Sequence, residues 1–194
     1  MPYISATSMK KEIRLLGIDD GPFNRGKDKT VIIIGAFFRG GSFLDGVVST
    51  RAKIDGIDAT KKITAMINKS KFKKQIQCIL LNGIAVGGFN VIDISKLREE
   101  TGIPVIVIVR RKPDINKIIA TLRKIGKTKE INAVKIAGKS LKINNLYIQL
   151  SGISLDKAQQ ILKIGTAHAI VPEALRVAHL IAGGVVRGES KGKS

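Results

Sequence analysis

Two short segments of this chain, 76–81 and 105–109, are almost entirely apolar, and the segment between them has the stop signals of a helix. Strands that are apolar on both faces are typical of parallel sheets, because helices cover both sides of such a sheet. Parallel strands also need a crossover connection between them, and these crossovers are right-handed. The two segments therefore predict the centre of an α/β sheet.

Three earlier segments have the pattern of antiparallel strands. The first, 13–18, is apolar and is followed by Asp19, Asp20 and a Gly-Pro turn. The second and third lie within 31–50 and flank a glycine-containing turn, which predicts a hairpin. We expect these three strands to form a meander, with two carboxylates where the first strand ends.

The rest of the chain alternates between helical and extended patterns. Helices are predicted near 58–68, 91–101, 113–126, 154–163 and 172–182, and further strands at 133–137 and 146–150. Asp58 is placed to cap the first helix. The order β-β-β-α-β-α-β, followed by a mixed part, matches a ribonuclease-H-like core, in which helices flank a mixed sheet.

The length of 194 residues fits a single domain over 1–194, with a flexible basic tail expected from about residue 184. No apolar stretch approaches the roughly 20 residues that a membrane span requires, and the first residues lack the pattern of a secretory signal. We therefore expect a cytoplasmic protein with no membrane contact. Cys78 lies in an apolar run and is expected to be buried.

The charge of the chain is strongly unbalanced. There are 34 Lys and Arg residues against 15 Asp and Glu, which gives a net charge of +19. Such an excess favours a nucleic-acid partner, whose binding should weaken with salt. The alternative is the lysine-rich surface of a thermophile protein, where charge serves solubility and ion-pair networks. Aromatic residues make up only 4% of the chain, so a stacking platform for single strands is not expected.

The few acidic residues form two groups. Asp19 and Asp20 end the first strand, while Asp55 and Asp58 precede the first helix. Carboxylates on adjacent elements are what two-metal phosphodiester hydrolysis requires, and Mg²⁺ prefers such oxygen ligands. The structural alternative is that Asp20 belongs to the Gly-Pro turn and that Asp58 only caps its helix.

Other familiar sites are not supported by the sequence. His168 and His179 are too far apart for a zinc pair, and Gly87-Gly88 lacks the glycine spacing of a dinucleotide fingerprint. His179 follows Arg176 by three residues, so both side chains could face one groove. The alternative is that His179 is a structural residue of its helix, with its hydrogen bonds satisfied within the protein.

Five strings of residues resemble an archaeal family that is related to endonuclease V and is called endonuclease dU. The resemblance spans nearly the whole chain, and the strings occur in the family's order. They are Leu16-Gly-Ile-Asp-Asp-Gly21, Ile54-Asp-Gly-Ile-Asp-Ala-Thr60, Leu81-Asn-Gly-Ile-Ala-Val-Gly-Gly-Phe-Asn-Val91, Gly102-Ile-Pro-Val-Ile-Val107 and Pro172-Glu-Ala-Leu-Arg-Val-Ala-His179.

The resemblance implies a ribonuclease-H-like fold and metal-dependent cleavage of nucleic acid that contains deaminated bases, uracil or hypoxanthine, as in DNA repair. DNA is favoured over RNA as the partner. Asp19 or Asp20 matches the family's first-strand carboxylate, and Asp58, with Asp55 behind it, falls where endonuclease V places its second acid. We expect Asp19 to face Asp58 and to hold Mg²⁺ or Mn²⁺ with it, while Asp20 serves the turn.

Asn82 departs from this pattern, because endonuclease V has an aspartate before the glycine at that point. An asparagine offers a carbonyl oxygen without the charge, so it holds a cation less strongly. Two functions on nucleic acid therefore stay open: an endonuclease with Asn82 at the edge of its metal site, and a non-catalytic nucleic-acid-binding protein that retains the fold. A third function, a small-molecule enzyme that uses the Asp cluster, is disfavoured by the net charge of +19. For the first two, the expected substrate contacts come from one loop and one helix, namely Gly83, Gly87, Gly88, Phe89, Asn90, Arg176 and His179.

Overall fold

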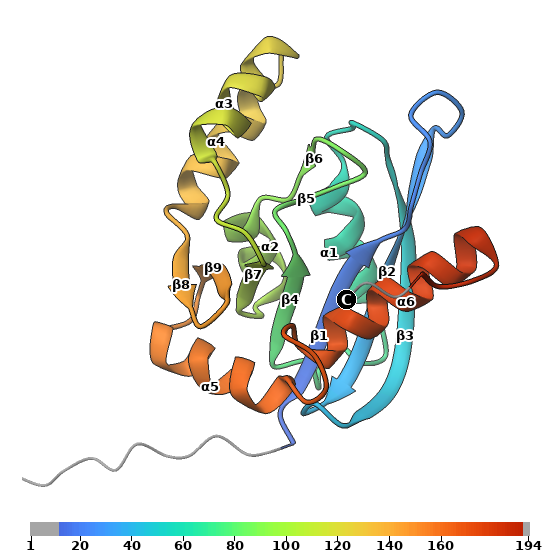
Figure 1. Cartoon of the computed structure of the whole chain (residues 1–194), viewed down its shortest axis with the longest axis vertical. Helices are drawn as coiled ribbons and strands as arrows, with labels where there is room; N and C mark the ends of the chain where they lie inside the picture. The colour runs from blue at the N-terminus through green and yellow to red at the C-terminus, as the bar shows by residue number, and fades with distance from the viewer. Residues whose placement is uncertain (1–11, 192–194) are drawn as a thin grey trace, which may run out of the picture.

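A seven-stranded sheet runs through the protein, and helices lie on both of its faces (Figure 1). The computed structural model describes residues 12–191. The strand order in the sheet is β3-β2-β1-β4-β7-β9-β8. The strands are β1 (Arg14–Asp20), β2 (Thr30–Arg39), β3 (Phe43–Lys53), β4 (Cys78–Asn82), β7 (Val105–Val109), β8 (Leu141–Ile143) and β9 (Leu146–Ser151).

The pairing of the strands confirms the predicted mixed sheet. Strands β1, β2 and β3 form the antiparallel meander, whereas β4 is parallel to both β1 and β7. The β8–β9 hairpin then adds antiparallel strands at the far edge. The fold is thus a ribonuclease-H-like mixed sheet flanked by helices, and the carboxyl ends of β1, β4 and β7 meet at one edge of it.

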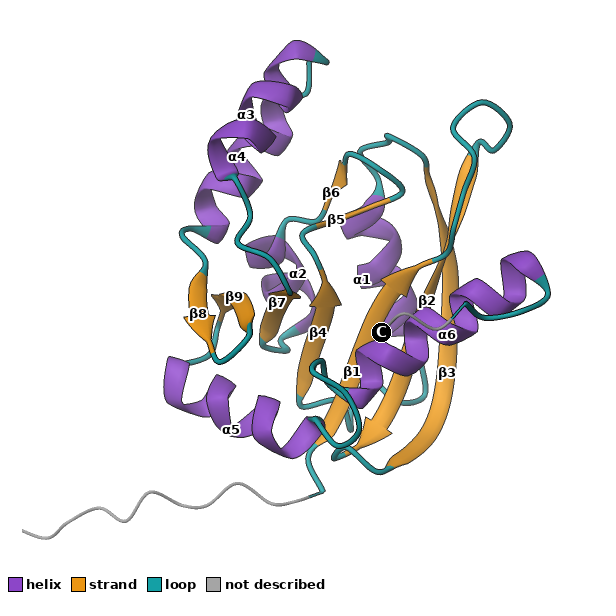
Figure 2. Cartoon of the chain, in the orientation of Figure 1, coloured by secondary structure: helices purple, strands orange, loops and turns teal. Residues whose placement is uncertain are grey.

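Six helices of the described residues surround this sheet (Figure 2). They are α1 (Ala59–Lys69), α2 (Ile94–Thr101), α3 (Ile115–Lys124), α4 (Thr128–Ala137), α5 (Leu155–Gly165) and α6 (Glu173–Arg187). Apolar residues of α5 and α6 pack on one face of the sheet and those of α1 and α2 on the other. Successive residues of a strand point to opposite faces, so Leu15 and Leu16 of β1 enter different cores.

Two predicted segments differ in the structure. The predicted strand 133–137 belongs to helix α4, in which Ile131, Val134 and Ala137 recur every three residues and are buried. The predicted loose tail from about residue 184 is also wrong at its start, because α6 continues to Arg187. The helix ends there because Gly188 adopts a left-handed conformation. Residues 192–194 lie outside the described part.

A small hairpin formed by β5 (Ala85–Val86) and β6 (Asn90–Val91) lies beyond the carboxyl end of β4. The predicted helix 91–101 therefore begins later, at Ile94, where Asp93 caps it through a bond from the amide of Lys96. Helices α3 and α4 pack together and onto this hairpin in a third, separate core. Together they project beyond the edge of the sheet (Figure 1).

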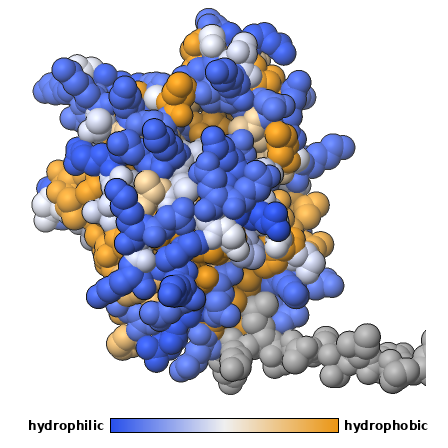
Figure 3. All heavy atoms as spheres, turned by 180° about the vertical axis from the view of Figure 1, so that it is seen from behind, coloured by the Kyte–Doolittle hydropathy of each residue, from blue (hydrophilic) through white to orange (hydrophobic). Residues whose placement is uncertain are grey.

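The single cysteine and the surface of the protein were also addressed by the sequence analysis. Cys78 is fully buried, as predicted, and burial raises the pKa of its thiol. Within residues 12–191, no helix is both long and apolar enough to cross a membrane. The face opposite to that of Figure 1 is largely hydrophilic, with apolar residues in scattered patches (Figure 3).

Helix α6 lies directly on strand β1 at Gly17. A Cβ atom at this position would lie 2.2 Å from the carbonyl carbon of Ala174 and 2.5 Å from the amide nitrogen of Leu175. Both atoms belong to the backbone of α6, so neither is able to move aside alone. The absence of a side chain at Gly17 is therefore what allows the helix and the strand to come this close.

Replacing Gly17 by Ala should force the strand and the helix apart. We expect the free energy of unfolding to fall by about 2 kcal/mol or more, which lowers the melting temperature of a chain of this size by roughly 5 °C. Thermal unfolding followed by circular dichroism measures this change. The matched control is Gly184→Ala in α6, where a Cβ meets no atom within 4 Å and Ala stabilises the helix. Equal melting temperatures for both variants would contradict the prediction.

Candidate functional site

Asp19 is the buried carboxylate at the carboxyl end of β1. Its exposed fraction is 4%, and the alternation of the strand places it on the face that α6 covers. Its Oδ1 accepts a hydrogen bond from the amide of Asp20 at 2.9 Å. Its Oδ2 is shared by two side chains from other elements, Asn82 and His179.

Asn82 reaches Asp19 from the neighbouring parallel strand. It is the last residue of β4, and its Nδ2 donates to Oδ2 of Asp19 at 3.0 Å. Because β1 and β4 are parallel and in register from Leu15 and Cys78 onward, both strands end at the same edge of the sheet. The side-chain amide of Asn82 therefore stabilises the Asp19 carboxylate, whereas an aspartate at the same place would repel it.

His179 completes the group from helix α6. Its Nδ1 lies 2.8 Å from Oδ2 of Asp19, although the two residues are 160 positions apart in the chain. The hydrogen bond to Asp19 raises the pKa of the imidazole, and this outweighs partial burial and the nearby charges of Arg187 and Arg110, which lower it. The imidazole is thus held at one nitrogen by a carboxylate, while its exposed part lines a cleft.

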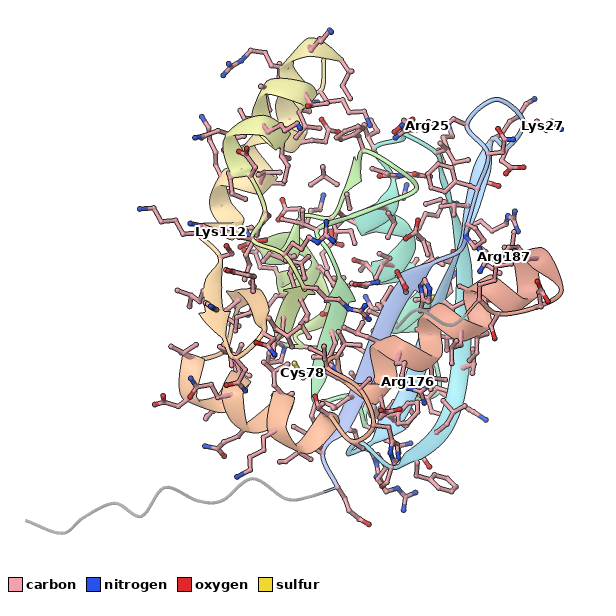
Figure 4. All side chains as sticks on the ribbon, in the orientation of Figure 1. Arg25, Lys27, Cys78, Lys112, Arg176 and Arg187 are labelled. Atoms are coloured by element: carbon pink, nitrogen blue, oxygen red, sulfur yellow. The ribbon has the colours of Figure 1, made fainter. Side chains whose placement is uncertain are left out.

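The cleft beside this group has a volume of about 400 Å³ and lies between α6 and the ends of β4 and β7. Three arginines line the cleft: Arg110 and Arg111 follow β7, and Arg176 lies on α6. Figure 4 labels Arg176 on this helix. Arg176 is held in place by Glu173, whose Oε2 accepts from its Nε and Nη2 at 2.7 Å. Guanidinium groups in such a cleft suit the binding of phosphate.

Asp20 faces the opposite side of β1. Its Oδ2 accepts from the amide of Gly87 at 2.8 Å, so it holds the loop between β5 and β6. Its expected role in the Gly21-Pro22 turn is therefore replaced by a contact distant in sequence. Desolvation raises the pKa of this carboxyl to about 6, with a further increase from Asp19, and the hydrogen bond from Gly87 only partly offsets the shift.

Asp55 and Asp58 also hold loops. Oδ1 of Asp55 accepts from the amide of Phe89 at 2.8 Å, and its carboxylate pairs with Arg25. Oδ1 of Asp58 accepts from Nδ2 of Asn90 at 2.8 Å and from the amide of Lys53 at 3.1 Å. These contacts tie the segment before α1 to the β5–β6 hairpin.

The prediction that Asp58 caps α1 is wrong. Its side chain makes no capping bond, and Oδ1 of the fully buried Asn90 accepts from the amide of Ala59 at 2.9 Å instead. The cap thus comes from a residue 31 positions away. Asn90 was expected to contact a substrate, and in this structure its polar atoms are engaged within the protein.

The structure brings together only part of the predicted site. Asn82, Arg176 and His179 share the cleft, with Asp19 behind them. Of the described residues, none hydrogen-bonds to both Asp19 and Asp58. The same part of the chain contains no group of three His, Cys, Asp or Glu side chains that could hold a metal ion.

The predicted substrate loop, which follows Gly83, lies along a second pocket. This pocket has a volume of about 290 Å³, is mostly apolar, and separates the β5–β6 hairpin from α3. Gly88 and Phe89 line it, whereas Gly87 carries the bond to Asp20. Val109 lines both this pocket and the cleft, so the two are neighbours.

The sequence analysis missed two of the arginines of the cleft as site residues. Arg110 and Arg111 follow directly after the apolar strand β7, and Glu173 precedes Arg176 by one helical turn. The position of the arginines after a central parallel strand is a usable signal, because ligands bind at the carboxyl ends of such strands.

Because the pKa of Asp20 is raised in the folded protein, the free energy of unfolding should depend on pH. In the unfolded chain this carboxyl titrates near 3.8 and in the folded protein near 6, so folding binds a proton between these values. Its contribution to stability is present below pH 3.8 and is lost as the pH rises through 6. Asp20→Asn removes this titration. Between pH 4 and pH 7 we therefore expect the free energy of unfolding of the variant to rise relative to that of the wild type by up to about 3 kcal/mol. Urea unfolding of the protein in chelator at both pH values measures the difference, and parallel pH profiles would contradict the prediction.

Comparisons with known proteins identify the family of this chain. The sequence model of the family described as "Endonuclease dU" matches residues 11–186. A UPF0215 protein of Methanothermobacter thermautotrophicus is 44% identical over 96% of this chain and 94% of its own length. Another, from Methanosarcina barkeri, is 46% identical over 96% of this chain and 97% of its own length.

Solved structures extend the comparison to the fold. A protein of unknown function from Archaeoglobus fulgidus superposes with a TM-score of 0.83 at 37% identity, over 89% of this chain and 97% of that one. Endonuclease V of Bacillus subtilis gives 0.61 at 13% identity, over 94% and 85%. Endonuclease V of Ciona intestinalis, solved in complex with DNA containing an inosine, gives 0.56 at 14% identity, over 85% and 82%. The protein has the fold of endonuclease V, and its sequence places it in the endonuclease dU family.

Proposed function

We propose that this protein is an endonuclease that cleaves nucleic acid in the cleft beside Asp19 and His179. The observation that carries the proposal is the Asp19 carboxylate itself, which is 4% exposed and hydrogen-bonded to a histidine of an arginine-lined cleft. Residues in a cleft whose pKa is shifted by a specific partner, as that of His179 is raised by its hydrogen bond to Asp19, are concentrated at functional sites. The family and the fold support the same activity.

The arginines of the cleft favour a phosphodiester as the substrate. Arg110, Arg111 and Arg176 present planar donors that match the oxygens of a phosphate group, and the net charge of +19 attracts a polyanion. The structural relative from Ciona intestinalis was solved with DNA containing an inosine. We therefore propose a strand with a deaminated base, hypoxanthine or uracil, as the substrate, with DNA favoured over RNA and repair as the role.

The donor set fits one divalent cation and not a pair of them. Asp19 and Asn82 lie together, whereas the oxygens of Asp55 and Asp58 are engaged by the loops they hold. Mg²⁺ or Mn²⁺ bound by one or two carboxylates and several waters needs no more than this. Asn82 would turn its amide so that Oδ1 faced the ion. When bound, the cation would supply an activated water and would neutralise charge on the phosphate.

His179 is placed to move a proton. With Nδ1 bonded to Asp19, the other ring nitrogen is free to exchange a proton in the cleft. Hydrolysis forms a bond from a water oxygen to phosphorus and breaks the bond from phosphorus to a sugar oxygen, which must then gain a proton. The protonated ring of His179 would donate this proton, and Arg176 would stabilise the phosphate charge.

The first test replaces Asp19 by Asn. The amide cannot hold a cation or stabilise the protonated His179, so we expect cleavage of uracil- or hypoxanthine-containing strands to fall by about 100-fold or more. Cleavage of labelled strands in Mg²⁺ or Mn²⁺ is the measurement, with unmodified strands and chelator beside it. Asp93→Asn is the matched control, because an asparagine there still caps α2. Unchanged cleavage by the Asp19 variant would overturn the assignment.

A second function, nucleic-acid binding without catalysis, is favoured by one observation. Asn82 is neutral where a second acid would strengthen a metal site, and it donates to Asp19 instead of repelling it. A wild-type protein that binds modified strands but cleaves none of them in either metal would select this function.

Asn82→Asp distinguishes the two functions. Two carboxylates would then lie about as close as the present 3.0 Å bond, so the metal-free variant should melt at a lower temperature than the wild type. Mn²⁺ should restore its melting temperature and raise its cleavage rate, because the added charge strengthens the site. A melting temperature that does not respond to Mn²⁺ would show that no cation binds between these residues.

A further inference from the structure

One segment carries a large part of the positive charge of the protein. The α3–α4 arm, which we define as residues 110–139, contains ten Lys and Arg residues against two acidic ones. The basic residues are Arg110, Arg111, Lys112, Lys117, Arg123, Lys124, Lys127, Lys129, Lys135 and Lys139. All of them except Lys127 are exposed. None of the ten forms an ion pair with a residue of the described range 12–191.

The arm is fixed in place by apolar packing. Leu122 of α3 and Ile131 and Val134 of α4 are buried in the third core, against Val91 of the β5–β6 hairpin. Lys127 adds a polar anchor, because its Nζ donates to the carbonyl oxygens of Gly56 at 2.6 Å and Phe89 at 2.8 Å. The charged residues are therefore held on a folded support beside the site.

The arm begins at the rim of the cleft. Arg110 and Arg111 line the cleft, and Pro113 and the capping residue Asp114 then start α3. From there the two helices project beyond the carboxyl edge of the sheet (Figure 1), and Lys112 marks the start of this projection (Figure 4). Positively charged residues thus continue from the cleft outward along the arm.

The dimensions of the arm match a nucleic-acid backbone. The ten residues of α3 extend for about 15 Å at 1.5 Å per residue. A duplex rises about 3.4 Å per base pair, so this length corresponds to about four base pairs. The arm contains no aromatic residue, and single-strand binders rely on stacking against such residues.

We propose that the α3–α4 arm binds the phosphate backbone of the duplex that flanks the cleavage site. This proposal rests on the proposed function, since it places the reacting phosphate in the cleft. It extends that function by making the substrate a duplex that continues past the cleft, instead of a short fragment. An acidic protein is the other partner that such a surface would suit.

The test removes two charges from one face of α3. Lys117→Ala/Lys124→Ala changes exposed residues seven positions apart, and it is made in the Asp19→Asn background so that binding is measured without cleavage. The matched control is Lys157→Ala/Lys163→Ala on α5, which removes the same charge from a helix at the opposite end of the molecule (Figure 1). Melting temperatures equal to that of the parent establish that both variants are folded.

The measurement is fluorescence anisotropy of a labelled duplex of about two helical turns, with a hypoxanthine near one end. Each phosphate contact contributes about 0.9 to the slope of log K against log salt. We expect the slope of the α3 variant to fall by about two and that of the α5 control to stay within about 0.5. A hairpin with a stem of about five base pairs centred on the hypoxanthine extends only about two base pairs past it, too few to follow the arm, and should bind both variants alike.

Equal slopes for the α3 variant and the α5 control on the long duplex would overturn the proposal and leave an acidic protein as the partner of the arm. An equal loss on the long duplex and the hairpin would also overturn it, because the charge would then act on the cleft itself. Neither result depends on cleavage. A failure of the proposed endonuclease activity is detected separately, by the absence of cleavage in the protein that carries Asp19.

Discussion

The close approach of β1 and α6 at Gly17 is the contact on which the site depends. Asp19 follows Gly17 by two residues, and His179 follows Ala174 by five, so the spacing of the two backbones sets the distance between carboxylate and imidazole. A larger side chain at Gly17 would lift the helix and lengthen the 2.8 Å bond between them. A backbone contact inside the core thus determines the chemistry of a cleft at its edge.

The scarcity of acid in the chain shapes this site. Asp20, Asp55 and Asp58 each accept hydrogen bonds from backbone or amide groups of neighbouring loops, whereas Asp19 is buried and bonded to the side chain of His179. Three of these four carboxylates therefore hold the loops around the site, and Asp19 alone of the four is bonded to a residue that lines the cleft. A single cation with a water-rich shell matches this distribution better than a pair of cations does.

The sheet could be predicted from the sequence because β-branched apolar runs are a local signal. Asn82 entered the candidate site only through the resemblance to endonuclease V, which has an aspartate at that point. The carboxylates were harder to assign, since several types of contact compete for each of them. Asn90 caps α1 from another part of the chain, and this leaves Asp58 without the role that its position indicated. The segment 133–137 was misassigned because five residues contain too little of a helical period to distinguish it from a strand.

Because His179 lies in helix α6, the site can form only after this helix has been synthesised. During synthesis all seven strands of the sheet, with Asp19 and Asn82, emerge before helix α6. A chain that stops before α6 has Asp19 and Asn82 but lacks His179, and the face of β1 around Gly17 is not yet covered by that helix. Helix α6 thus both covers this face of β1 and contributes His179, so a nascent chain gains its cleft only after residues 173–187 have been synthesised.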